Sequence, residues 1–159
     1  MRTRGRVAGI ASAVAVVLSL IFVGLEVRES ARQTELNTQS LQLGAYQDLI
    51  SQIAAINLVA IEYPEVSLAI QGSLEGLSPA EREQANNAMF MMARHGDMAF
   101  YQYELGMLTE ERLESALGLL NVSLCRPGFR EWWSNVSHLF VASYREFVSA
   151  KISANENCE

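Results

Sequence analysis

Hydrophobic residues are continuous near the N-terminus and periodic in the rest of the chain. From Val7 to Leu25 no residue is charged; three arginines precede this stretch and Glu26 follows it. At a rise of about 1.5 Å per residue, a helix of this length just crosses the hydrocarbon core of a bilayer. The pattern therefore predicts a transmembrane helix over residues 7–25, preceded by a basic tail over residues 1–6.

A cleaved signal peptide would share the basic start and the hydrophobic middle of this stretch. Its hydrophobic region is usually shorter, about 7–15 residues, and no A-x-A pattern follows the stretch in this chain. A retained anchor is therefore the better interpretation. Because arginines are concentrated before the span, the positive-inside rule favours, by a small margin, a cytoplasmic N-terminus and a domain outside the cytoplasm.

Two spacing patterns in the N-terminal part predict helix association. Gly5, Gly9 and Ala13 recur every fourth residue, which lets membrane helices approach closely, although an Ala-rich span also produces this pattern by chance. Beyond the span, apolar residues are spaced by seven, as in a coiled-coil seam. These residues are Leu36, Leu43 and Ile50. We therefore expect a helical stalk over residues 26–45 and a dimer formed through anchor and stalk.

A small all-α domain of four or five helices is predicted over residues 46–152, with a polar tail over residues 153–159. Pro64 ends the first helix, because proline disfavours helical geometry in the residue before it. Ser78, with Glu81 three positions later, predicts a capping box at the start of a long helix. No segment has the alternation of a strand. The predicted helices cover 46–63, 64–70, 78–105, 109–124 and 133–152.

The charge of the chain beyond the span is strongly negative. All 18 acidic residues but only nine of the 12 basic residues lie there, a formal charge of −9, which disfavours nucleic acid as a partner. Cys125 and Cys158 are the two cysteines, too few for a disulfide scaffold. Their number is compatible with one disulfide outside the cytoplasm or with two free thiols.

The sequence contains no recognisable catalytic, metal-binding or phosphate-binding motif. His95 and His138 are the only histidines, and no H-x-x-x-H or C-x-x-C spacing exists. His95 and Asp97 do not share a helix face, so they are poorly placed to bind one metal ion. We therefore expect no catalytic residue, no metal and no cofactor, and a protein that is not an enzyme.

Aromatic and polar residues of the domain are the candidates for a pocket or a partner surface. Tyr101, Tyr103 and Glu104 either line a small-molecule pocket between helices or simply reach water at a helix edge. Trp132 and Trp133 are adjacent and so point about 100° apart, which predicts one in the core and the other at a partner or the bilayer. The full candidate set is Phe100, Tyr101, Tyr103, Glu104, Arg130, Trp132 and Trp133.

Four methionines lie close together at positions 89, 91, 92 and 98, among several aromatic residues. Methionine is common on surfaces that bind many partners, because its side chain is flexible and polarisable. A stripe of methionine and aromatic residues at helical spacing is more often part of a core. We therefore expect these methionines to be buried, with a groove for a partner or lipid as the alternative.

Between about residues 40 and 150 the segments AYQDLISQIAAIN, EYPEV, MFMMARHGDMAFYQYELGMLTEE and CRPGFREWW follow one another, ahead of a closing aromatic helix. Together with the basic N-terminus and the apolar stretch, this order resembles an uncharacterised family of bacterial single-pass membrane-anchored all-helical proteins, a domain of unknown function. The resemblance implies a small all-α domain and no catalytic residues.

These observations predict a non-enzymatic, membrane-anchored interaction module, an accessory or assembly subunit of a larger membrane complex. Its expected location is the bacterial inner membrane, with a cytoplasmic N-terminus and a periplasmic domain. The expected partners are the bilayer, through residues 7–25, and a protein, either a second copy or a larger membrane complex. The alternative is an extracytoplasmic sensing or small-ligand-binding domain that acts with a partner chain.

Overall fold

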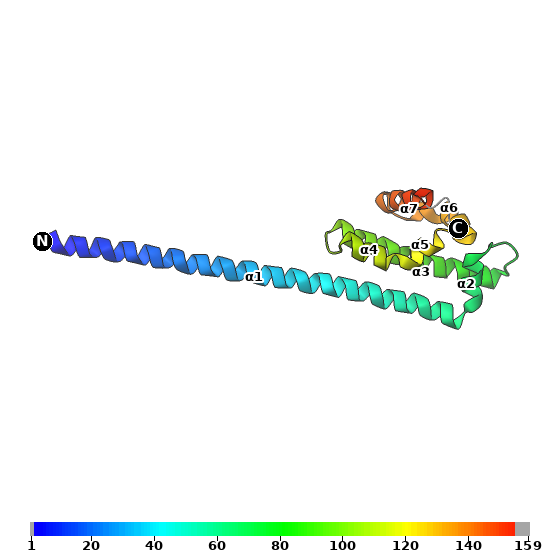
Figure 1. The fold of residues 1–159 in the computed structure, drawn as a ribbon, viewed down its shortest axis with the longest axis horizontal. Helices are drawn as coiled ribbons and strands as arrows, with labels where there is room; N and C mark the ends of the chain where they lie inside the picture. Colours follow the sequence, from blue (N-terminus) through cyan, green and yellow to red (C-terminus); the bar gives the residue numbers. More distant parts are fainter. Residues whose placement is uncertain (1, 155–159) are drawn as a thin grey trace. The chain divides into compact units, whose positions relative to one another are not determined.

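The protein is mostly helical in the part that the computed structural model describes, which is the backbone of residues 2–154 and the side chains of residues 14–68 and 70–154. Within residues 2–154 there is no strand, which confirms the predicted all-α class. The elements follow one another in Figure 1 as α1 (Arg2–Glu62), α2 (Pro64–Gln71), α3 (Pro79–Glu104), α4 (Glu110–Ala116), α5 (Gly118–Ser123), α6 (Pro127–Val136), the 3-10 turn η1 (Ser137–Leu139) and α7 (Ala142–Ala154).

The chain divides into two compact units, Met1–Leu41 and Gln42–Glu159. In the first unit, the large apolar side chains described between positions 14 and 25 are all more than half exposed. Within the described residues, no helix combines the length and the apolar character that a membrane crossing needs. Gly5, Gly9 and Ala13, the predicted association residues, lie outside the residues whose side chains are described.

The predicted coiled-coil positions are exposed on α1. The exposed fractions of Leu36, Leu43 and Ile50 are 53%, 59% and 45%. Self-association through these residues stays a prediction.

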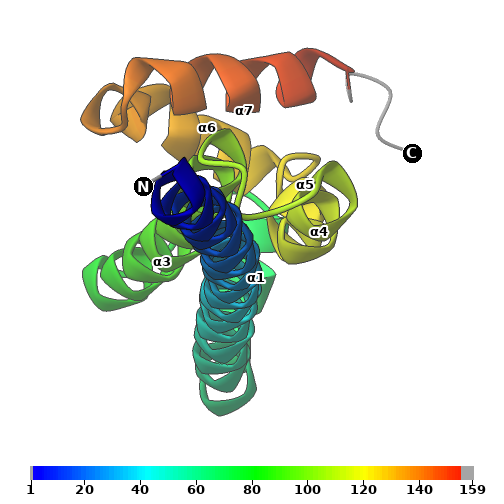
Figure 2. The same cartoon turned by 90° about the vertical axis from the view of Figure 1, so that its left-hand side faces the viewer.

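The second unit is built around α3, which contacts α2, α4, α5 and α6. Its buried face includes Ala85, Met89, Ala93 and Ala99, all at 0% exposure, and the small side chains among them let neighbouring helices approach closely. In both views, α7 lies on the far side of this unit from the last turns of α1 (Figures 1 and 2).

Both ends of α3 lie where the sequence predicts them. The Ser78 hydroxyl accepts a hydrogen bond from the Glu81 N–H, and the Glu81 carboxylate accepts one from the Ser78 N–H at 2.8 Å, which completes the capping box. The hydrogen bonds from Ser78 lower the pKa of Glu81. At the other end Gly106 has a φ of 70°, the left-handed conformation in which glycine commonly ends a helix.

Two predicted helices are each broken in the structure. The helix expected over 109–124 is divided at Leu117, and the helix expected over 133–152 is interrupted by η1 and by Phe140, whose backbone is extended. In one continuous helix, Trp133 and Tyr144 would lie about 16 Å apart along the axis. The turn instead brings their rings to a centroid distance of 6.0 Å, so burial of aromatic residues outweighs helix continuity here.

A close contact at Gly96 holds α3 against α5 and α7. A Cβ atom placed at Gly96 would collide with Tyr144 Oη and lie 2.7 Å from Leu120 Cδ2. Tyr144 is fully buried, and its hydroxyl has no hydrogen-bond partner among the described residues. Burial also raises the pKa of Tyr144 well above its ordinary value. Glycine is therefore required at position 96 because the neighbouring side chains leave no room for a Cβ atom, and not because of the backbone conformation.

We expect Gly96→Ala to lower the free energy of unfolding by about 1–3 kcal/mol, the usual cost of adding a methyl group to a filled core. Chemical denaturation followed by circular dichroism measures this change. Gly118→Ala is the matched control, because a Cβ there meets open space. Equal effects of the two substitutions would show that the close approach at Gly96 is not limiting. In a Tyr144→Phe background, which lacks the colliding oxygen, Gly96→Ala should be less harmful.

Candidate functional site

One face of α3 remains uncovered, although the helix is central to the second unit. Its side chains are separated by 3, 4, 3 and 4 positions, so they lie along one face of the helix. We call them the α3 stripe: Met91, Arg94, Met98, Tyr101 and Leu105. The exposed fractions of its four apolar members lie between 40% and 55%. An exposed apolar row of this regularity on a helix that also contributes to the core is typical of a contact surface.

Two open hollows follow the stripe and share Arg94 and Met98. The first has a volume of about 290 Å³ and is lined by Arg94, Asp97, Met98, Phe100, Tyr101, Glu104 and Val141. The second has a volume of about 280 Å³ and is lined by Gln52, Ala55, Ile56, Met91, Arg94, His95 and Met98. Arg94 and Met98 lie where the two hollows adjoin, and we refer to the two hollows together as the groove.

Arg94 is fixed in the middle of this groove. Its guanidinium bonds to the Asp97 carboxylate at 3.1 Å and donates to the Leu139 carbonyl at 3.2 Å. It also lies 4.2 Å from the centre of the Phe140 ring, a cation–π contact. These contacts tie the turn before α7 to α3 and leave the local charge balanced.

The structure brings together three of the predicted site residues, Phe100, Tyr101 and Glu104, in the first hollow. Tyr103 is 38% exposed and does not line this hollow. The half-buried Arg130 donates from Nε to the Leu124 carbonyl at 2.7 Å, so it supplies a hydrogen bond to the carbonyl of the residue that follows α5.

Both tryptophans are in the core, so the expectation that one of them faces a partner or the bilayer was wrong. Trp132 and Trp133 are 4% and 5% exposed. Phe90 packs edge-on against Trp132 at 4.9 Å, and Phe140 lies 5.0 Å from Trp133. The Trp132 indole N–H donates to Asn86 Oδ1 at 2.7 Å. Adjacent side chains both become buried because α6 is covered on two sides.

The methionine cluster divides between core and surface. Met89 and Met92 are buried, as the sequence predicts, whereas Met91 and Met98 are exposed and belong to the α3 stripe. The signal that would have separated them is the spacing of positions 91, 94, 98, 101 and 105, which selects one face of the helix.

A separate apolar pocket in the second unit was not predicted. It lies between the last turns of α1 and helices α2, α3 and α5, and its volume is about 130 Å³. Its apolar lining includes Ile56, Val66, Ile70, Ala88 and Met92, all buried. These residues come from three helices, and no spacing along the sequence indicates that they meet.

His95 joins three helices through its ring. Nε2 lies 3.1 Å from the Ala116 carbonyl oxygen, and Nδ1 lies 3.3 Å from the Gln52 side-chain amide. The Ala116 carbonyl oxygen can only accept, so Nε2–H donates to it, and this is where a neutral imidazole has its one N–H. Burial lowers the pKa of His95 and favours this neutral form.

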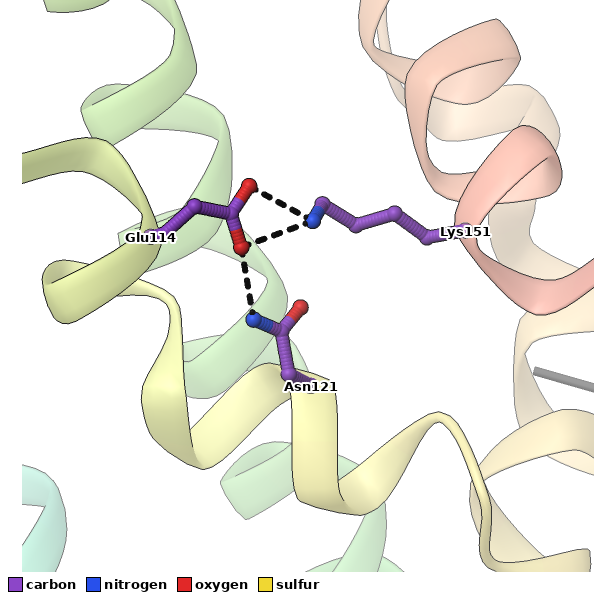
Figure 3. Close-up of polar contacts among 3 residues, drawn as sticks. All are labelled: Glu114, Asn121 and Lys151. Carbon is purple, nitrogen blue, oxygen red and sulfur yellow. Dashed lines mark hydrogen bonds and ion pairs between the residues drawn. The ribbon is translucent and has the colours of Figure 1, made fainter. Parts of the chain in front are cut away.

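A polar cluster attaches α7 to α4 and α5 (Figure 3). The Lys151 ammonium lies 2.8 Å and 3.0 Å from the two carboxylate oxygens of Glu114, and the Asn121 side-chain N–H donates to the same carboxylate at 3.1 Å. Because Glu114 is 45% exposed, solvent screens the pair and its contribution to stability is small.

Cys125 is disulfide-bonded, so the alternative of two free thiols was wrong. The chain has one other cysteine, Cys158, which lies outside the described residues. Within the described residues, no group of three or more histidine, cysteine or acidic side chains is arranged to hold a metal ion.

Comparison of the chain with protein-family models, with curated proteins and with solved structures finds no match. The resemblance to bacterial membrane-anchored helical proteins therefore stays a prediction.

We expect the domain to lose stability as the pH falls below about 6.5, the ordinary pKa of histidine. Burial lowers the pKa of His95 in the folded state below its value in the unfolded chain. Between these two pKa values the unfolded state binds more protons than the folded state, so a fall in pH favours unfolding. Urea denaturation between pH 7.5 and pH 5.5 measures the slope, which should flatten in His95→Gln. The exposed His138 provides the control: His138→Gln should keep the wild-type slope, and a flattened slope there would contradict the assignment.

Proposed function

We propose that the chain is a non-enzymatic, membrane-tethered interaction module whose helical domain docks one helix of a protein partner along the α3 stripe. The observation that carries this proposal is the regular exposed row on α3, a helix whose opposite face is buried in the core. Apolar residues separated by three and four positions are what a second amphipathic helix packs against. The two methionines of the stripe have flexible, polarisable side chains, which suit a surface that adapts to its partner.

The groove also defines the chemistry of the partner. From position 91 to position 105 the stripe is about 21 Å long, which matches about four turns of a helix. Glu104 lines the groove and has no hydrogen bond or ion pair among the described residues. The chain beyond residue 25 carries a formal charge of −9. The partner is therefore a basic amphipathic helix, presented by a larger membrane complex that this chain accompanies or helps to assemble.

Residues 7–25 form the tether in this proposal, with the N-terminus in the cytoplasm and the helical domain in the periplasm of a bacterium. The support is the absence of charge from these residues, the exposure of the apolar side chains described in this stretch, and the arginines before it. The disulfide at Cys125 agrees with an oxidising compartment.

We expect a photo-crosslinking amino acid at Met98 or Tyr101 to capture one partner in living cells. The same group at Leu68, which is 68% exposed on α2, is the control position and should not capture it. The captured protein should contain a basic amphipathic helix at the crosslinked site, identified by mass spectrometry. Met98→Glu should abolish capture from Tyr101 without changing the thermal unfolding curve, because Met98 is exposed.

Two outcomes contradict the docking proposal. Equal capture at Leu68 and Met98 would mean that the α3 stripe is not a selective surface. Capture of this chain alone at Met98 would make a second copy the occupant, in place of another protein.

We expect the wild-type chain to stay with the membrane fraction after alkaline extraction. Two charges in the middle of the apolar stretch, Val16→Arg with Val17→Arg, should release it, because each arginine costs about 2.5–3.5 kcal/mol at the centre of a membrane helix. Val27→Arg, two positions beyond the stretch, is the control and should stay with the membrane. Recovery of the wild-type chain in the soluble fraction would contradict the proposal that residues 7–25 anchor it in the membrane.

A further inference from the structure

We propose that the apolar pocket of the second unit binds a small carboxylate, a compact apolar body of about six or seven carbons that carries one carboxylate group. This inference is independent of the α3 stripe, because the residues that line the pocket do not include any member of the stripe. It rests on the volume of the pocket, its apolar floor and the donors at its edge.

The size of the pocket limits the apolar part of the ligand. Its volume is about 130 Å³. A dry apolar cavity of about 150 Å³ in another protein accommodates benzene, so a six-membered ring or a branched chain of similar size fits here. Val66, Ile70 and Met92 are among the buried lining residues and offer no hydrogen bond to a ligand. Burying such a body in the pocket is favourable through the hydrophobic effect.

The edge of the pocket supplies donors and one positive charge. Asn57, Gln71 and Arg126 line it, and their side chains have N–H groups for which no hydrogen bond occurs among the described residues. Arg126 is the only charged residue in the lining. A carboxylate is the group that suits these donors, because it accepts several hydrogen bonds and can bind a guanidinium through both oxygens.

The guanidinium of Arg126 is available, whereas most arginines of the second unit are engaged. Arg82 donates to the Leu74 carbonyl, Arg94 pairs with Asp97, and Arg112 lies over the Tyr46 ring. The backbone of Arg126 is nevertheless held, since its N–H donates to the Ser123 carbonyl at 2.9 Å and its carbonyl accepts from Arg130 at 3.1 Å. Arg126 therefore has a held backbone and a side chain without a partner in the described part of the chain, so it is free to bind an anion at the mouth of the pocket.

Nuclear magnetic resonance of the full chain in lipid nanodiscs, with labelled methionine methyl groups, tests this inference. The probe is cyclohexanecarboxylate, and cyclohexanecarboxamide is its uncharged counterpart of the same shape. We expect the carboxylate to shift the Met92 methyl signal in a saturable way while the Met98 signal on the α3 stripe stays unchanged. The carboxamide should bind about ten-fold more weakly, because it lacks the charge-assisted hydrogen bond.

Three variants separate the parts of the site. Arg126→Gln should weaken carboxylate binding about ten-fold and leave carboxamide binding unchanged. Arg145→Gln is the matched control, because the side chain of Arg145 makes no hydrogen bond or ion pair among the described residues and does not line the pocket. It should bind as the wild type does. Ala60→Leu, at an exposed lining position, should fill the pocket and abolish binding of both probes.

Three results overturn the inference. The first is that the Met92 methyl signal shows no saturable shift at millimolar concentrations of cyclohexanecarboxylate. The second is that the wild type and Arg126→Gln bind the carboxylate with equal affinity. The third concerns size: affinity that rises steadily from hexanoate to decanoate would mean that the pocket takes a lipid chain and not a small carboxylate.

Discussion

The second unit depends on how closely α3 can approach its neighbours. Gly96 leaves room for Tyr144 Oη and for Leu120, so helices from both sides meet the middle of α3. The aromatic rings of α6 and α7 then pack around Tyr144, whose hydroxyl is left without a partner. A buried hydroxyl without a hydrogen bond is unfavourable, and this arrangement persists because the surrounding packing contributes more.

Local signals predicted the ends of helices better than the breaks within them. The capping box that begins at Ser78 and the glycine at position 106 that ends α3 each depend on a few neighbouring residues, and the structure contains both. The breaks at Leu117 and Phe140 have no such local cause. They bring residues distant in sequence into one core, and the gain from burying those residues exists only after the chain has folded.

The candidate sites show the same limit. Helical spacing places Met91 and Met92 on different faces of α3, but which of the two faces is exposed depends on how the other helices pack on α3. The adjacent tryptophans were assigned to opposite environments, although a helix covered on two sides buries both. The pocket beside Arg126 joins side chains from four helices, so it depends on the tertiary arrangement alone.

Lys151 is the only lysine in the chain, and it is engaged with Glu114 between α7 and α4. Reagents that acylate amines therefore have one side-chain target in the protein. Acylation removes the positive charge of that side chain and with it the ion pair. The extent of labelling at Lys151 would then report how often α7 separates from α4, which makes this single lysine side chain a probe of local opening in the helical domain.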